Sequence, residues 1–234
     1  RVAFEEIYLH KHEFLKTVEK FNKKKSFELI INKESMDIFY SSLPFSLTSG
    51  QISAINKISN SIRDKRPSKV LIQGDVGYGK TIVAIIACYQ ALKNNHQCLV
   101  LVPTEVLCSQ HFKTFTEYLG NYGMVEMISG KNTKAEKECI KRKLYDGQIS
   151  VLIGTHALLF NDYKFRSLAI VIIDEQHKFG IKQREKISSD YENQPHLIYM
   201  SATPIPRTLA LVLYENMNYI TIPDKPSNRD ITKT

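Results

Sequence analysis

A glycine-rich stretch between an apolar run and a helical segment gives the chain its clearest chemical signal. The stretch QGDVGYGKT follows KVLI and precedes IVAIIACYQAL, and it fits the pattern G-x-x-x-x-G-K-[ST]. Glycines let successive backbone N–H groups turn towards phosphate oxygens, and the N-terminus of the next helix adds positive partial charge. The stretch therefore predicts a nucleotide-binding loop made of Gly74, Asp75, Val76, Gly77, Tyr78, Gly79, Lys80 and Thr81.

Two side chains at the end of this loop bring chemistry of their own. Lys80 would reach the β- and γ-phosphates of a nucleotide, and the Thr81 hydroxyl can ligate Mg²⁺. The alternative is a glycine-rich structural turn that contains a lysine by accident. The strand-like run before the loop and the apolar-faced helix after it favour the nucleotide-binding interpretation.

A pair of carboxylates offers the second half of such a site. The apolar run LAIVIID ends in Asp174, and Glu175 follows it directly. Asp174 would hold Mg²⁺, and Glu175 would orient or deprotonate the water that attacks a phosphoanhydride. An acidic pair after a strand is commonplace by itself, but beside a phosphate loop it predicts nucleotide hydrolysis.

The elements that must position these residues follow from alternating apolar runs and helix-length stretches. The apolar runs predict strands at 69–73, 97–102, 123–128, 150–154, 168–174, 196–200 and 219–222. Most are separated by predicted helices, at 80–94, 105–119, 133–146, 180–190 and 206–215. This alternation predicts an α/β fold with a doubly wound, mostly parallel sheet. Ligands bind beyond the carboxyl ends of the strands in such sheets.

Composition limits the classes of protein that remain. The 234 residues carry a net charge of +8, which favours polyanionic partners through phosphate neutralisation. The cysteines form no C-x-x-C pair, and Cys88 and Cys98 sit in apolar segments, so we expect reduced core thiols in a cytoplasmic protein. No apolar run approaches the roughly 18 residues of a membrane span, and we expect no membrane association.

The chain divides into three expected segments. Residues 1–42 begin with an amphipathic helix that must dock on another surface, and the charged run NKKKSFELIINKES after it suggests a linker. Residues 43–223 carry the predicted sheet. Residues 224–234 contain prolines and no apolar face, which predicts a connector to a further domain.

Several motifs resemble, in order and spacing, those of superfamily 2 helicases, the DEAD/DEAH-like motors. These motifs are PTE at 103–105, GTHAL at 154–158, DEQH at 174–177 and SAT at 201–203. More narrowly, GDVGYGKT, DEQHKFGIKQRE and MSATPIPRTLAL look like the RecG family of bacterial branch-migration DNA helicases. Tyr78, Lys178 and Ser201 depart from residues common in that family but leave the phosphate- and metal-binding groups intact. The resemblance implies an ATP- and Mg²⁺-dependent motor, with 43–223 as its first RecA-like lobe.

The resemblance also implies roles for residues that chemistry alone would not single out. Gln51 resembles the adenine-reading glutamine of helicases, although Thr48 and Gln51 also fit a helix capping box, and both interpretations can hold. His177 resembles the residue that links the nucleotide site to the rest of the motor, so we group it with the catalytic pair.

Two further groups of residues are implied to act outside the nucleotide site. A coupling turn follows the strand HLIYM, and we expect its hydroxyls to lie within reach of Asp174 and His177; it consists of Ser201, Ala202 and Thr203. DNA-facing motifs place three candidate phosphate contacts just past apolar strands, where polar caps of strand ends are the alternative: Thr104, Gly130 and Thr155. The lysines of 131–144 could touch a duplex, but a solvated helix face is the favoured explanation.

The partners implied by the resemblance are branched duplex DNA, meaning forks and Holliday junctions, together with a second RecA-like lobe and a wedge domain in the same protein. A transcription-repair coupling motor or an RNA helicase lobe is an alternative within the same class. A nucleotide-dependent switch that does not move along nucleic acid is the alternative from another class.

Overall fold

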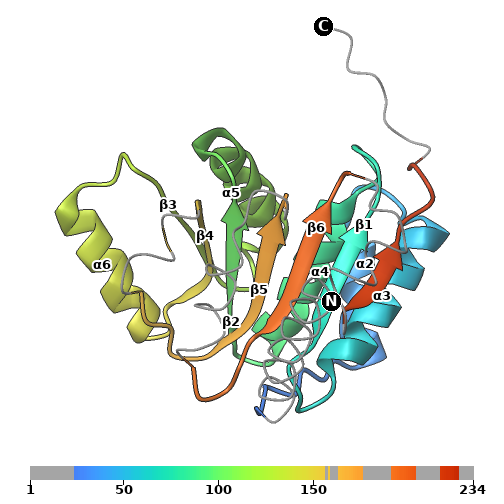
Figure 1. Ribbon diagram of the computed structural model, residues 1–234, viewed down its shortest axis with the longest axis horizontal. Helices are drawn as coiled ribbons and strands as arrows, with labels where there is room; N and C mark the ends of the chain where they lie inside the picture. The colour runs from blue at the N-terminus through green and yellow to red at the C-terminus, as the bar shows by residue number, and fades with distance from the viewer. Residues whose placement is uncertain (1–23, 156–157, 159–162, 176–190, 204–216, 227–234) are drawn as a thin grey trace, which may run out of the picture.

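The sheet is built entirely from parallel strands. The computed structural model describes residues 24–155, 158, 163–175, 191–203 and 217–226 (Figure 1). Within these ranges seven strands form one sheet in the order β3-β4-β2-β5-β6-β1-β7. The strands are β1 (Lys69–Gln73), β2 (Gln97–Val102), β3 (Met124–Ile128), β4 (Ile149–Thr155), β5 (Leu168–Asp174), β6 (His196–Ser201) and β7 (Asn218–Thr221). The predicted parallel α/β sheet is confirmed, and each predicted strand lies within a residue of its observed bounds.

Helices cover both faces of the sheet. They are α2 (Lys33–Ser41), α3 (Ser49–Ile62), α4 (Lys80–Lys93), α5 (Glu105–Leu119) and α6 (Lys134–Tyr145). The predicted helices at 80–94, 105–119 and 133–146 correspond to α4, α5 and α6, whereas those at 180–190 and 206–215 lie outside the described residues. Alternate strand residues pack with α2 to α5 in one cluster, and the intervening ones pack with α6 in a second cluster.

The central helix α4 is buried around most of its circumference. Its residues from Ile82 to Leu92 are buried without interruption, since the helix lies between the sheet and α3. The rings of Tyr89 and Phe39 meet there with centroids 4.3 Å apart. This packing fixes the N-terminus of α4, and with it the phosphate loop, against the end of β1.

The segment before residue 43 belongs to the same hydrophobic core. Leu29 and Phe39 are 1% and 0% exposed, and the backbone N–H of Leu29 donates to Ile62 O at 3.1 Å. The run that we expected to be a linker is therefore packed from residue 26 onward, and the core continues across the expected boundary at 42–43. The predicted amphipathic helix before it lies outside the described residues. None of the helices in the ranges given above is long and apolar enough to cross a membrane.

Candidate nucleotide-binding site

Strand order brings the predicted site residues to one edge of the sheet. β6 lies between β1 and β5, with Ser201 beside Gln73 of β1 and Met200 beside Asp174 of β5. The phosphate loop leaves the end of β1, and the acidic pair ends β5. All three strands run parallel, so the loop, the acidic pair and the turn after β6 meet at the carboxyl edge.

The phosphate loop depends on glycine at its last turn. Gly79 caps α4 with φ +77° and ψ +32°, a left-handed conformation that residues with a Cβ adopt at a cost. A Cβ at this position would also overlap Nε2 of Gln51. Gly77 has a positive φ as well, at +86°. These two glycines allow the chain to wind tightly from β1 into α4.

Lys80 lies across the loop that it follows. Its Nζ donates to Gly74 O at 2.7 Å and to Asp75 O at 3.1 Å. Burial lowers the pKa of the half-buried ammonium from its ordinary value, and the carboxylates of Asp174, Glu175 and Asp75 oppose part of that shift. The ammonium is therefore held between the loop carbonyls and the acidic pair.

Gln51 joins α3 to the phosphate loop. Its Oε1 accepts from Thr48 N at 3.0 Å and its backbone N donates to Thr48 Oγ1 at 3.2 Å, which completes the capping box. Its Nε2 donates to Tyr78 O at 3.0 Å, and the side chain is buried. The capping interpretation is thus observed, and the same amide also bonds to the phosphate loop.

A cleft of about 610 Å³ runs along this edge. It is lined by the phosphate loop and the acidic pair, and also by an apolar group made of Phe45, Leu47 and Tyr118. The rings of Phe45 and Tyr118 meet edge to face with centroids 6.4 Å apart. Sequence reasoning missed this apolar group. The available signal was an aromatic residue three positions before the cap of α3, which becomes informative only once Tyr118 is known to face it.

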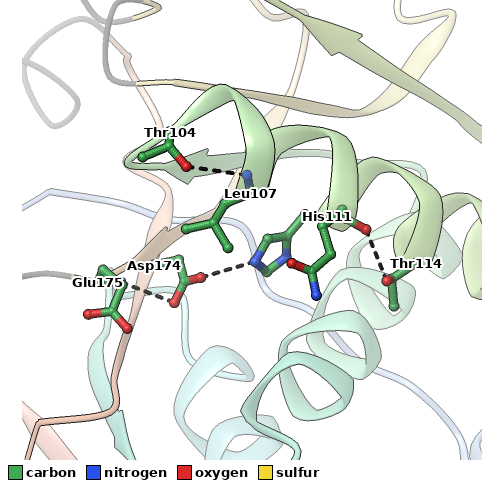
Figure 2. A network of polar contacts seen from close by, with 7 residues as sticks. Thr104, Leu107, His111, Thr114, Asp174 and Glu175 are labelled. Atoms are coloured by element: carbon green, nitrogen blue, oxygen red, sulfur yellow. Dashed lines mark hydrogen bonds and ion pairs between the residues drawn. The ribbon is translucent and has the colours of Figure 1, made fainter. Parts of the chain in front are cut away.

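The acidic pair has a partner that the sequence did not reveal. Asp174 Oδ2 and His111 Nε2 lie 3.0 Å apart, and Glu175 N donates to Asp174 Oδ1 at 3.0 Å (Figure 2). Glu175 has φ +54°, an uncommon conformation for a non-glycine residue. His111 lies on α5, and its only sequence signal was its place on the buried face with Cys108 and Phe115. His177 lies outside the described residues.

The turn after β6 bonds to the end of β1. Gly74 N donates to Ser201 O at 3.3 Å, and Gln73 Nε2 donates to Thr203 O at 3.1 Å. Within the turn, Thr203 N donates to Ser201 Oγ at 3.2 Å. We expected these hydroxyls to lie within reach of Asp174 and His177, which stays a prediction because His177 lies outside the described residues; the bonds between this turn and its neighbours given above go to the end of β1. Ala202 lines the cleft.

The candidate DNA contacts have partners within the protein. Thr104 caps α5, with Leu107 N donating to Thr104 Oγ1 at 3.3 Å, and Gly130 N donates to Glu105 Oε1 at 2.7 Å. Thr155 ends β4 and is partly exposed. Thr104 and Gly130 are thus engaged within the protein, and contact of these positions with DNA stays a prediction.

The lysines of the basic helix α6 are exposed or partly exposed. Lys141 Nζ bonds to Glu138 Oε1 at 2.9 Å and lies 5.5 Å from the centre of the Tyr163 ring. Thr133 and Glu136 form a capping box at its start, and these hydrogen bonds lower the pKa of the Glu136 carboxyl. Local pairing and capping thus account for part of the charge on α6.

These features define a class of protein. A parallel sheet with a phosphate loop after β1, and an acidic pair after a central strand at the same edge, is the architecture of a P-loop nucleotide-binding lobe of the RecA-like kind. Residues 48–212 match the sequence model of the DEAD/DEAH box helicase family, and the chain belongs to that family.

Individual relatives point to one group of helicases within this family. The chain is 39% identical over 231 residues to the ATP-dependent DNA helicase RecG of Aquifex aeolicus, covering 98% of this chain and 29% of that protein. It is 39% identical over 235 residues to the protein of the same name from Thermotoga maritima, covering 100% and 30%. A solved structure of RecG bound to a three-way DNA junction matches with a TM-score of 0.83 and 36% identity, covering 98% and 31%. The predicted resemblance to RecG is confirmed, and the chain spans less than a third of these relatives.

Proposed function

We propose that this chain is the ATP-binding lobe of a DNA helicase that couples ATP hydrolysis to the remodelling of branched DNA in recombination and repair. The proposal rests on one observation: Lys80, Asp174 and Glu175 line the same cleft. The loop before Lys80 winds tightly into α4 because Gly77 and Gly79 have positive φ. Similarity to RecG over nearly the whole chain supports the choice of DNA as substrate.

The triphosphate is placed on the N-terminus of α4. Backbone N–H groups of the loop face the phosphates, and Lys80 exchanges its bonds to Gly74 O and Asp75 O for phosphate oxygens. Release of the two carbonyls leaves the loop free to adjust around the nucleotide. Glu175, beside Asp174 at the cleft, orients or deprotonates the attacking water.

Mg²⁺ fits the donor set at the same place. Thr81 and Asp174 both line the cleft and offer a hydroxyl and a carboxylate, which are the hard oxygen ligands that Mg²⁺ prefers. Thr81 and Asp174 would hold the ion, which would supply positive charge against the phosphates of the nucleotide.

We propose that the base packs against the apolar group of the cleft. Phe45 and Tyr118 provide aromatic surface there, and Gln51 lines the same cleft and bonds to Tyr78 O of the phosphate loop. The Gln51 amide reads adenine only if it gives up a bond to Thr48 or Tyr78, so its adenine contact is part of the proposal. We further propose that the whole protein contains a second RecA-like lobe and a wedge domain. In this chain, DNA phosphates would bind near Thr155 and the start of α5.

Substitution of the loop lysine tests the proposal directly. Lys80→Ala should abolish binding of a fluorescent ATP analogue by this chain, because backbone amides alone do not offset the charge of a triphosphate. In the full-length protein the same change should remove hydrolysis stimulated by fork DNA. Lys57→Ala, on the exposed side of α3, is the matched control and should bind as the unmodified chain does.

Two results would count against the proposal. Equal nucleotide affinity of the Lys80 and Lys57 variants would show that the loop is structural. Turnover by the full-length protein that does not respond to fork DNA would instead support a nucleotide-dependent switch.

A further inference from the structure

The contact between His111 and Asp174 joins helix α5 to the metal-binding end of β5. The two side chains are 7% and 14% exposed, and His111 Nε2 lies 3.0 Å from Asp174 Oδ2. His111 faces the cleft from α5 while Asp174 faces it from the sheet (Figure 2). A hydrogen bond between these groups is shielded from water on most sides, which strengthens it relative to one at the surface.

Both oxygens of the carboxylate are engaged before any ligand arrives. Oδ1 accepts from the N–H of Glu175, and Oδ2 faces His111. An ionised carboxylate can only accept, so Nε2 of the histidine carries the hydrogen in this bond. Two donors on different elements thus fix the rotation of the carboxylate about its own axis.

Packing alone does not account for a histidine here. Its Nδ1 is buried and has no hydrogen-bond partner within the described ranges, which is unfavourable for a polar atom. An apolar side chain of similar size would fill the space beside Phe115 without leaving that atom unsatisfied. The bond from Nε2 to Asp174 is the interaction that offsets this loss.

We propose that His111 is a positioning residue that holds the Asp174 carboxylate in the orientation needed to bind the Mg²⁺ of a Mg²⁺–nucleotide complex. The inference rests on the proposed nucleotide site and adds a supporting residue to it. Donors behind a ligating carboxylate orient it and tune its affinity for metal, and their loss typically weakens metal binding about 10- to 100-fold. His111 stands in that relation to Asp174.

A pair of polar substitutions separates positioning from packing. Glutamine extends its amide nitrogen about as far as Nε2 of histidine, whereas asparagine keeps an amide but falls short of Asp174. The quantity to measure is the affinity of this chain for a non-hydrolysable fluorescent ATP analogue, with saturating Mg²⁺ and with a chelator. The ratio of the two affinities isolates the metal contribution from the contacts of Lys80 and the loop.

His111→Asn should lower this ratio about 10-fold or more and leave the metal-free affinity unchanged, and His111→Gln should retain most of it. Mn²⁺ in place of Mg²⁺ gives a second readout, because the electron paramagnetic resonance signal of the bound ion reports its ligand environment. That signal should broaden or change in the Asn variant and stay close to the unmodified one in the Gln variant.

Unchanged metal dependence in His111→Asn would overturn the inference, as would equal losses with and without metal, since both results indicate a packing role. If the Asn variant does not fold, His111→Gln is compared with the unmodified chain. A 10-fold or larger loss of the metal contribution in His111→Gln would then also contradict the inference. Failure of the proposed function looks different, because then the unmodified chain and Lys80→Ala bind nucleotide alike.

Discussion

The substitution Gly79→Ala tests how closely the phosphate loop is fitted to its surroundings. Gly79 has φ +77°, and a Cβ built there would overlap Nε2 of Gln51. The alanine therefore faces two separate penalties: a backbone conformation unfavourable for L-residues, and a collision with a buried amide. Gln51 cannot yield freely, because the same amide bonds to Tyr78 O and completes the cap with Thr48.

The magnitude follows from these contacts. A left-handed conformation costs a non-glycine residue about 1–2 kcal/mol. Displacing Gln51 sacrifices a buried hydrogen bond to Tyr78, about 1 kcal/mol, and part of the α3 cap, about 1 kcal/mol. The free energy of unfolding should therefore fall by about 3–4 kcal/mol, and nucleotide affinity should fall with it because the loop is displaced.

Urea denaturation of five proteins measures the effect: the unmodified chain, Gly79→Ala, Gly147→Ala, Gln51→Ala and the double variant. Gly147→Ala is the matched control, since Gly147 has φ +76° but its added Cβ meets only the flexible Arg166 side chain. It should lose about 1–2 kcal/mol and keep full nucleotide affinity. In a Gln51→Ala background, Gly79→Ala should lower the free energy of unfolding by no more than this control does. Equal losses from Gly79→Ala with and without Gln51, or a loss matching Gly147→Ala, would refute the reasoning.

Two further predictions concern residues outside the loop. Asp224 Oδ2 accepts from Ser49 Oγ at 3.0 Å and Gly50 N at 3.1 Å at the start of α3, so Asp224→Asn should lower the free energy of unfolding by about 0.3–1 kcal/mol, less in high salt, by urea titration. Burial lowers the pKa of His196 in the fold below that of the unfolded ring, which protonates near pH 6.5. Stability should fall as the pH drops below about 6.5, and His196→Gln should flatten this slope; a slope unchanged by the substitution would exclude His196 as its source.

The sheet could be predicted because its signals are local. Strands covered on both faces are continuously apolar, as in LAIVIID of β5, so length and flanking residues identify them without knowledge of their neighbours. The phosphate loop carries its own glycines, and the carboxyl edge of a parallel sheet collects whatever follows each strand. The pairing of the loop with Asp174 was therefore accessible from the sequence.

What escaped prediction depends on contacts between distant segments. His111 and Asp174 are 63 residues apart, and Phe45, which precedes α3, meets Tyr118 of α5 only in the folded chain. No repeat or spacing in the sequence links the two members of either pair. The packing of the charged run before α2 escaped for a different reason: its lysines obscured Leu29, which is buried and donates through its backbone N–H to Ile62 O at the end of α3.

The orientation of the turn after β6 changes where coupling between nucleotide and motion would run. Ser201 O accepts from Gly74 N, and Thr203 O accepts from Gln73 Nε2, so the turn is attached to the strand that leads into the phosphate loop. Lys80 holds the carbonyl of the same Gly74 and would release it to bind phosphate. Gly74 thus donates its N–H to the turn after β6 and accepts a hydrogen bond from Lys80 at its carbonyl. A change at the triphosphate would then reach Ser201 through the backbone of the loop, while Asp174 is held separately by His111 on the other side of β6.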